Sequence, residues 1–379
     1  MVSLKITSPE QDRYETTLRN RSQIAMDESK LAPKLLKQHL QWYRGLFAVA
    51  ILLLAPFAEA AESHKQSLML MGSGFEITAI ATDKSTAREA VKLAIEEIQR
   101  IEKLISEWDS TSQTAAINRY AGIREVKVDR ELIELIRRSL SVSRLTNGAF
   151  DISFASMAKI WKFDRKEHPL PDSALVKQAS ELINWQKIQI DTTRKTVFLE
   201  EKGMRIGFGA IGKGYAANSA KRKMQQLQGV LGGVVNASGD LTAWGQSIHP
   251  NGWSVQLANP DSRNKPIGWI RLNNMSIVTS GDYEHYFTHN GKRYSHIIDP
   301  RTGYPVVGIK SVTILCPDAE LGDALATSVS VLGIDEGLYL VNKLNGVECL
   351  IIDQENKLHR SEHLQINYYG TDQSTIHPK

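Results

Sequence analysis

The spacing of hydrophobic residues predicts several helices. A helix over Asp83–Ser106 is expected, with Thr86 and Glu89 forming a capping box at its start. A second helix is predicted from Asp129 to Thr146, where Asn147-Gly148 ends it. Further helices are expected at residues 172–183, 214–227, 320–331 and 335–344. The apolar positions that carry the first prediction recur every three or four residues: Ala87, Val91, Ala94, Ile98, Ile101 and Ile105.

Short apolar runs bounded by turn residues predict strands between these helices. Ser67–Ala81 is interpreted as one strand, and Ile188–Ile190 with Thr196–Leu199 as a hairpin around Thr192–Arg194. Other strands are expected at residues 232–236, 253–257, 267–272, 276–279, 293–298, 311–315 and 348–352. Most strands are neighbours in sequence and the helices fall in separate blocks. The predicted fold class is therefore α+β, with mainly antiparallel sheets flanked by helices.

Composition narrows the class of protein. The 379 residues are 42% hydrophobic and 23% charged, which is typical of a soluble globular protein. Residues 1–60 contain eight Lys or Arg and six Asp or Glu, so only about +2 of the net charge of +4 belongs to the rest. This balance gives no indication of a nucleic-acid partner.

An apolar run near the N-terminus predicts export. Residues 46–58 (LFAVAILLLAPFA) follow Lys34, Lys37 and Arg44 and precede a small-x-small cleavage pattern at Ala58–Ala60. Residues 1–61 are therefore interpreted as a leader with a signal peptide, residues 62–370 as the functional domain and residues 371–379 as a polar tail. The expected location is periplasmic. The alternative is an uncleaved leader that associates the protein with the inner membrane, although the run is shorter than the roughly 18 residues that a span needs.

The two cysteines give no indication of a metal site. Cys316 and Cys349 each border an apolar run, which predicts that both lie in buried strands. In an oxidising compartment the two alternatives are a disulfide between these cysteines and two free thiols.

A glycine-rich segment, residues 207–214 (GFGAIGKG), is the first candidate for chemistry. It follows an expected strand and opens a helix. It matches the GxGxxG spacing of dinucleotide-binding folds, but no acidic residue stands about 20 positions later. It also matches GxxxxGK of the P-loop, but Gly214 stands where a Ser or Thr hydroxyl is required. What remains is an anion site for a pyrophosphate, made of backbone amides, a helix N-terminus and Lys213. The structural alternative is a tight turn whose glycines serve packing.

Further motifs, taken in order, resemble the ApbE family of FAD:protein FMN transferases. They are GAFDI at 148–152, the glycine segment, NASGD at 236–240, TSGDY at 279–283, GKRYSHIIDPRTGYP at 291–305 and GDALAT at 322–327. The resemblance runs from about Met71 to Gly333. It implies two lobes with an FAD cleft between them, cleavage of the FAD pyrophosphate with release of AMP, and transfer of FMN to a Thr or Ser hydroxyl of another protein.

The resemblance also implies roles for individual residues. A divalent cation, Mg²⁺ or a similar ion, is expected at the Ala210 carbonyl, Asp323 and Thr327. On a helix the last two project from one face, one turn apart, as two oxygen ligands. Lys213 is expected to stabilise charge during transfer, with His296 or Asp299 as candidate bases. The expected FAD contacts are Met71, Asn118, Gly148, Ala149, Phe150, Lys213, Ser280 and His296.

One position departs from the family pattern, since Gly207 stands where the family usually has an aspartate. Three other functions are alternatives to FMN transfer. The first is an FAD pyrophosphatase, in which water replaces the target hydroxyl. The second is a periplasmic FAD-binding protein without turnover, which the loss of a carboxylate at position 207 favours. The third is a P-loop phosphotransferase. Family targets are typically flavin-carrying subunits of membrane redox complexes, so such a subunit is the expected acceptor.

Overall fold

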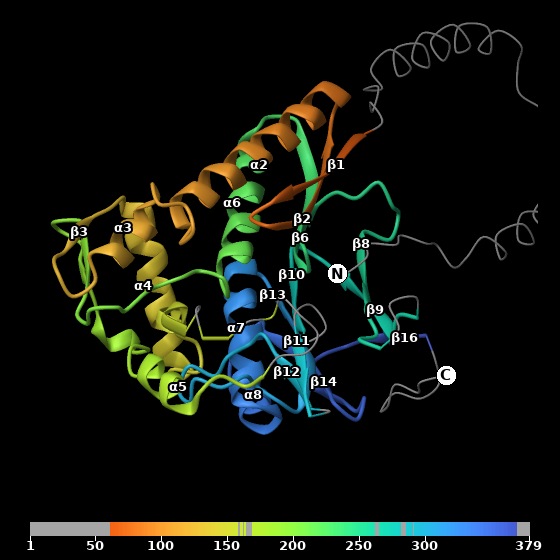
Figure 1. The fold of residues 1–379 in the computed structure, drawn as a ribbon. Coiled ribbons are helices and arrows are strands. Elements are labelled where there is room, and N and C mark those ends of the chain that lie inside the picture. The colour runs from red at the N-terminus through yellow and green to blue at the C-terminus, as the bar shows by residue number, and fades with distance from the viewer. Residues whose placement is uncertain are drawn as a thin grey trace, which may run out of the picture. The chain divides into compact units, whose positions relative to one another are not determined.

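An eight-stranded antiparallel sheet forms the centre of the fold (Figure 1). The computed structural model describes residues 61–369 except 158–159, 162, 164–168, 262–264, 282–285 and 291. The predicted apolar leader segment and polar tail lie outside the described residues. The strands of the sheet, in spatial order, are β1 (Glu62–Leu70), β2 (Ser73–Ala81), β6 (Val230–Ala237), β7 (Asp240–Gly245), β10 (Ser276–Gly281), β13 (Ile309–Cys316), β14 (Glu348–Asp353) and β15 (Leu358–Arg360).

Helices cover one face of this sheet and a small sheet covers the other (Figure 1). The helical face carries α2 (Lys84–Ile105), α6 (Gly212–Gln226), α7 (Ala319–Leu332) and α8 (Ile334–Asn342). Buried residues of β2, α2 and α6 share one apolar cluster, which includes Phe75, Ile98 and Ala217. On the opposite face, β8 (Trp253–Leu257), β9 (Gly268–Leu272) and β16 (Asn367–Tyr368) pack on the sheet through a second cluster.

A third group of elements lies beyond the helical layer (Figure 1). It comprises α3 (Gln113–Arg119), α4 (Arg130–Leu145), the 3-10 turns Ile152–Met157 and Trp185–Lys187, α5 (Ser173–Ser180), and the three-stranded sheet of β3 (Val126–Lys127), β5 (Thr196–Leu199) and β4 (Ile188–Asp191). β11 (Tyr286–His289) and β12 (Lys292–Ser295) form a separate hairpin. The α+β prediction with antiparallel sheets is confirmed, whereas the division into two lobes stays a prediction.

The predicted strand over Ser67–Ala81 is wrong in one respect that matters for the site. The chain forms two strands joined by a turn at Met71-Gly72, where the φ angles are 49° and 70°. Gly72, Ser73 and Gly74 interrupt the apolar run and are a turn signal that the one-strand prediction overlooked. The turn brings Met71 to the end of the hairpin.

Other differences concern element boundaries. Asp83, and not the Thr86–Glu89 pair, caps α2, because its carboxylate accepts the Thr86 backbone N–H at 2.9 Å. The strand expected at 293–298 ends at Ser295, and only a single bridge joins Ile298 to Pro305. The sequence patterns predict no strand at β3, β7, β11, β15 or β16 and no helix at α3, most of which are short or follow closely on another element. Among the described residues no helix is long and apolar enough to cross a membrane.

Both cysteines lie in buried strands, as predicted, and both are free thiols. Cys316 pairs with Ser276 across the sheet, and Cys349 pairs with Ile314. Burial raises the pKa of the Cys316 thiol to about 12. The thiols are therefore inert core side chains.

Candidate functional site

A cavity of about 740 Å³ opens beside the N-terminus of α6. It collects residues from segments that are far apart in sequence: the β1–β2 turn, the C-terminal end of α2, residues 149–154, the glycine-rich segment, the end of β10, residues 296–300 and α7. The cavity is large enough for a substantial part of a dinucleotide. Its lining includes Met71, Ala149, Phe150, Ala210, Lys213, Ser280, His296, Asp323 and Thr327, all of which the sequence predicts as site residues.

Hydrogen bonds outside any strand hold the residues that lead into the glycine-rich segment. Residues 204–208 are extended but belong to no strand, so the expected strand before the segment is absent. The Asn118 side chain donates to the Ile206 carbonyl at 2.9 Å and accepts the Ile206 N–H at 2.8 Å. The Gly207 N–H donates to the Ile152 carbonyl at 2.9 Å. These three bonds fix the backbone where it enters the cavity.

The start of α6 packs directly on the start of α7, and Gly214 makes this possible. A Cβ atom at position 214 would lie 2.1 Å from the Ala319 carbonyl oxygen and 2.9 Å from Asp323 Cβ. The Gly214 N–H donates to Asp323 Oδ2 at 3.0 Å. The residue that breaks the P-loop pattern is therefore required here by the contact between two helices, which leaves no room for a Ser or Thr side chain.

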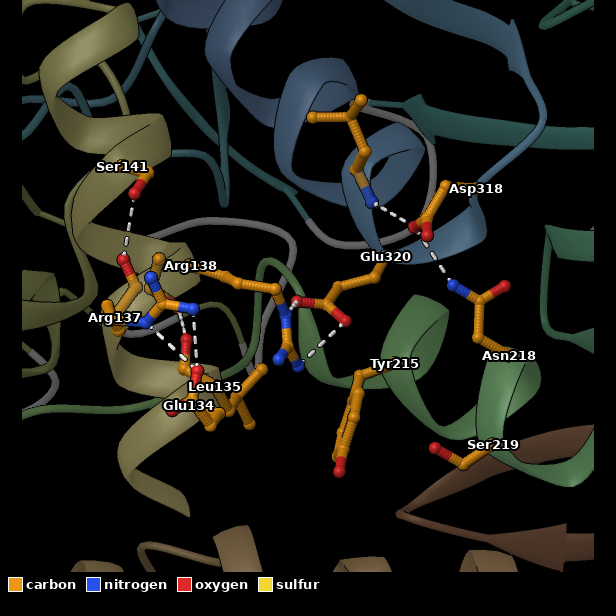
Figure 2. Close-up of polar contacts among 12 residues, drawn as sticks. Glu134, Leu135, Arg137, Arg138, Ser141, Tyr215, Asn218, Ser219, Asp318 and Glu320 are labelled. Atoms are coloured by element: carbon orange, nitrogen blue, oxygen red, sulfur yellow. Dashed lines mark hydrogen bonds and ion pairs between the residues drawn. The ribbon is translucent and has the colours of Figure 1, made fainter. Parts of the chain in front are cut away.

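Asn218 fixes the same pair of helices one turn further along α6. Its side chain donates to Asp318 Oδ1 at 2.9 Å (Figure 2). It also accepts the Ala319 N–H at 3.2 Å. Asp318 in turn caps α7 by accepting the Leu321 N–H. The position of Asp323 relative to the glycine-rich segment is therefore set by bonds between backbone and buried side chains.

Two buried carboxylates and one ammonium group form a charged centre, of which Lys213 and Asp323 line the cavity. Lys213 Nζ lies 2.8 Å from Asp240 Oδ2, and Asp323 faces the same two groups. Burial raises the pKa of the Asp323 carboxyl well above its ordinary value, and the Asp240 carboxylate raises this pKa further. Lys213 and the Gly214 N–H act in the opposite direction. The centre has more negative than positive charge when both carboxylates are ionised, so a cation would be bound favourably there.

The residues at this centre fit a magnesium-type ion. Asp323 and Thr327 lie one turn apart on α7 and line the cavity together with Ala210. Among the described residues there is no group of three or more His, Cys, Asp or Glu side chains able to hold a metal. Mg²⁺ commonly uses one or two carboxylates and completes its shell with phosphate and water, so a sparse set of protein ligands suits it.

Three predicted site residues do not line the cavity. Asn118 binds the Ile206 backbone instead, as described above. Gly148 has a φ of 78° and ends α4, its N–H donating to the Ser143 carbonyl at 2.8 Å. Asp299 accepts two hydrogen bonds from the Arg301 guanidinium, both at 2.9 Å, and its backbone closes a turn with Gly303.

The sequence patterns predict no site role for several residues that line the cavity or contact its lining. Asp240 lies in the NASGD motif, which was too short to interpret alone. Asp151 lies in the GAFDI motif and accepts bonds from Ser153 and the Trp185 backbone. Glu107 lines the cavity and occupies the space above Gly207. Only the fold brings residue 107 to residue 207, so no local signal could have identified that contact.

The fold and the cavity define an α+β protein with a glycine-rich segment at a helix N-terminus beside a buried aspartate. The model of the ApbE family matches residues 71–351. The chain is similar to an FAD:protein FMN transferase of Klebsiella pneumoniae (strain 342), with 30% identity over 82% of this chain and 95% of that protein. It is also 32% identical to an FAD:protein FMN transferase of Treponema pallidum (strain Nichols), over 72% of this chain and 80% of that one.

Solved structures agree with this assignment. A crystal structure of the ApbE protein of Thermotoga maritima has a TM-score of 0.72 and 28% identity, covering 79% of this chain and 97% of that one. The apo form of the Pseudomonas stutzeri flavinyl transferase ApbE shares the fold, with a TM-score of 0.70 and 24% identity over 79% of this chain and 94% of that one. The chain belongs to the ApbE family, and it is a transferase.

Proposed function

We propose that this protein transfers the FMN half of FAD to a threonine or serine hydroxyl of an acceptor protein, with release of AMP. One observation carries the proposal: Lys213 and Asp323 line the same cavity. The N–H of Gly214, which follows Lys213 in the chain, donates a hydrogen bond to Asp323 Oδ2. Backbone amides at a helix N-terminus and an ammonium group bind a pyrophosphate. A buried carboxylate beside them provides the place for a cation.

Each group of the cavity has a role in this reaction. The amides of the glycine-rich segment and Lys213 hold the diphosphate and stabilise the negative charge that grows on its oxygens during transfer. Mg²⁺, held by the Ala210 carbonyl, Asp323 and Thr327, would supply further neutralisation of that charge. Asp240 holds Lys213 in position, since its carboxylate lies 2.8 Å from the ammonium nitrogen.

The remaining cavity walls suit the flavin and nucleotide parts of FAD. Met71, Phe150 and Phe154 offer apolar surface, and Ser280 and His296 offer polar groups. His296 lies edge-on to Phe163, with ring centroids 6.5 Å apart, which restricts its orientation. We assign His296 to contact with the nucleotide. Asn118 and Gly148 shape the site by holding the backbone that surrounds it.

The acceptor and the location follow from the same proposal. An exported chain that attaches FMN would act on a periplasmic segment of a flavin-carrying subunit of a membrane redox complex. The signal-like run at residues 46–58 supports export.

The proposal is tested by incubating the protein with FAD, Mg²⁺ and a threonine-containing acceptor peptide, followed by mass spectrometry of the peptide. We expect an added FMN unit on the peptide and AMP in solution. Asp323→Ala is expected to reduce the rate by at least about 100-fold, and removal of the divalent ion with EDTA to have a similar effect. Free FMN without a labelled peptide would identify a pyrophosphatase instead. Bound but intact FAD would identify a flavin-binding protein.

A further inference from the structure

β1 forms one edge of the central sheet, and among the described residues it pairs only with β2 (Figure 1). Its nine residues pair with β2 in continuous register, without a bulge. At about 3.3 Å per residue, the strand offers an edge roughly 30 Å long. β15, at the other edge of the sheet, has only three residues. A short edge strand is protected from further pairing by its length, whereas β1 is not.

The turn after β1 determines which of its backbone groups face outward. A two-residue turn at Met71-Gly72, with positive φ at both residues, joins β1 to β2 and is closed by the pair Leu70–Ser73. In such a hairpin the closing pair turns its N–H and C=O groups towards each other, and the orientation alternates along the strand. The outer edge therefore carries the N–H and C=O groups of every second residue: Ser63, Lys65, Ser67 and Met69.

This outer edge leads to the mouth of the cavity. β1 ends at Leu70, and the next three residues, 71–73, all line the cavity. α2 packs beside β1 and ends near the same place, where Ser106 and Trp108 also belong to the lining. A strand added to β1 would therefore bring its own chain to the part of the cavity wall that the turn forms.

The surface of β1 leaves room for such a strand. The side chains of all four outward residues are exposed, and Met69 is 71% exposed. Prolines and bulges normally protect an edge from another strand, and β1 has neither. Its one lysine, Lys65, lies 2.7 Å from a carboxylate oxygen of Glu76 on β2, so the charge of this lysine is partly neutralised within the hairpin.

We propose that the outer edge of β1 binds the acceptor protein as an added strand and guides its threonine or serine into the cavity. The inference rests on the proposed FMN transfer. The partner is an extended segment that flanks the modified hydroxyl. Main-chain hydrogen bonds would hold this segment with little demand on its side chains, and Met69 offers it an apolar contact beside the cavity. An extended chain is also the narrowest form of backbone that can carry a hydroxyl into a cavity shared with FAD.

The first test is Ser67→Pro, which removes one outward N–H from the middle of the edge. The pairing of β1 with β2 is retained because that N–H points away from β2. With FAD, Mg²⁺ and an acceptor peptide whose flanks are as long as β1, the KM for the peptide is expected to rise by at least about tenfold. The kcat at saturating peptide and the FAD dissociation constant should each change by less than about threefold.

Ser67→Ala is the matched control for this variant, because it removes the side-chain hydroxyl and keeps the N–H. Its KM for the peptide should stay within about twofold of the parental value. Melting temperatures of both variants show whether the hairpin is intact. An unchanged KM in a folded Ser67→Pro variant overturns the inference.

The second test leaves the protein as it is and changes the acceptor peptide. N-methylation of alternate amides removes the donors from one edge of an extended peptide and leaves those of the other edge. One of the two methylated sets is expected to lose at least about tenfold in kcat/KM, and the other less than about threefold. Equal losses for the two sets would contradict the addition of a strand.

Hydrogen exchange of the full chain, followed by NMR, distinguishes the acceptor from other occupants of the edge. The four outward amides are expected to exchange quickly in the protein alone and to slow by at least about tenfold when the peptide is added. Slow exchange in the protein alone overturns the inference, because residues 1–60 or a second copy of the chain would then cover the edge. Gel filtration identifies the second copy.

The fate of the proposed function is read from the parent protein. Transfer of FMN by the parent, with the same KM in Ser67→Pro, refutes strand addition and leaves the proposed function standing. If the parent transfers no FMN to the peptide, both proposals fail.

Discussion

Single residues determine the geometry of this cavity, and Gly214 is one example. The residue sits where α6 meets α7, with the Ala319 carbonyl oxygen 2.1 Å from the position of a Cβ atom. Its N–H reaches Asp323 because nothing stands between the two backbones. Gly214, which departs from the P-loop pattern, is thus the residue that brings the glycine-rich segment to the Asp323 carboxylate.

Gly214→Ala is therefore expected to be strongly destabilising. The methyl group would overlap a backbone atom that cannot rotate away, so the free energy of unfolding should fall by about 3 kcal/mol or more. Gly209→Ala is the matched control within the same segment, because its Cβ would meet only the Phe154 ring at an ordinary 3.7 Å. Chemical denaturation of both variants gives the comparison. Equal stabilities would show that the α6–α7 contact is looser than described.

At the scale of elements, the short helix α3 acts as a support for the glycine-rich segment. Ser112 caps this helix by accepting the Ala115 N–H at 2.9 Å. At its other end Asn118 pairs with both polar groups of the Ile206 backbone. The extended residues that lead into the cavity thus gain from a side chain the bonds that a strand would take from a neighbour.

Asn118→Ala tests this support. Loss of two hydrogen bonds to buried backbone should lower the free energy of unfolding by about 2 kcal/mol, at roughly 1 kcal/mol each. FAD binding should weaken as well, because the loop amides lose their fixed position. Ser110→Ala provides a control in the preceding turn, since that side chain is exposed. Unchanged stability together with weakened FAD binding would instead favour a direct contact between Asn118 and the flavin nucleotide.

At the scale of the whole molecule, an ion pair joins α7, which covers one face of the central sheet, to α4, which lies beyond the helical layer. Arg138 donates to both carboxylate oxygens of Glu320, at 2.6 and 3.1 Å, and lies over the Tyr215 ring (Figure 2). The Glu320 side chain is only 9% exposed, whereas Arg138 is 43% exposed. Since Glu320 precedes Asp323 by one turn of α7, this pair helps to fix the helix that carries the candidate cation ligands.

Arg138→Met should leave a buried carboxylate without its partner. Because Arg138 is partly exposed, the expected loss in the free energy of unfolding is about 2 kcal/mol near neutral pH, below that of a fully buried pair. Burial already raises the pKa of Glu320, and Arg138 lowers it, so the variant raises this pKa further. A raised carboxyl pKa penalises the folded state above that pKa, and the penalty disappears as falling pH protonates the group.

The loss caused by Arg138→Met should therefore shrink as the pH is lowered from about 8 to about 5. Denaturation curves of the variant and the parent across that range provide the measurement. Adding Glu320→Gln should recover most of the loss, since no buried charge remains. A loss that is the same at every pH would indicate that the stem of Arg138 matters for packing and its charge does not.

The fold class and most helices could be predicted from the sequence alone, and most of the predicted site residues line the cavity. Helical periodicity located α2 and α4, because their buried residues repeat every three or four positions. Long motifs such as SHIIDPRTGYP and GDALAT indicated His296, Asp323 and Thr327, and all three line the cavity. These predictions succeeded because periodicity and motif length are properties of contiguous residues.

The contacts between distant segments became known only from the folded structure. Three contacts each join residues from separate parts of the chain: Asn118 with the Ile206 backbone, Lys213 with Asp240 and Asp323, and Glu107 with the space above Gly207. Burial, and with it the raised pKa of Asp323 and Glu107, exists only once those segments have packed together. Because one sequence carries no measure of which distant side chains meet, the chemistry of this cavity could be outlined from motifs but completed only from the fold.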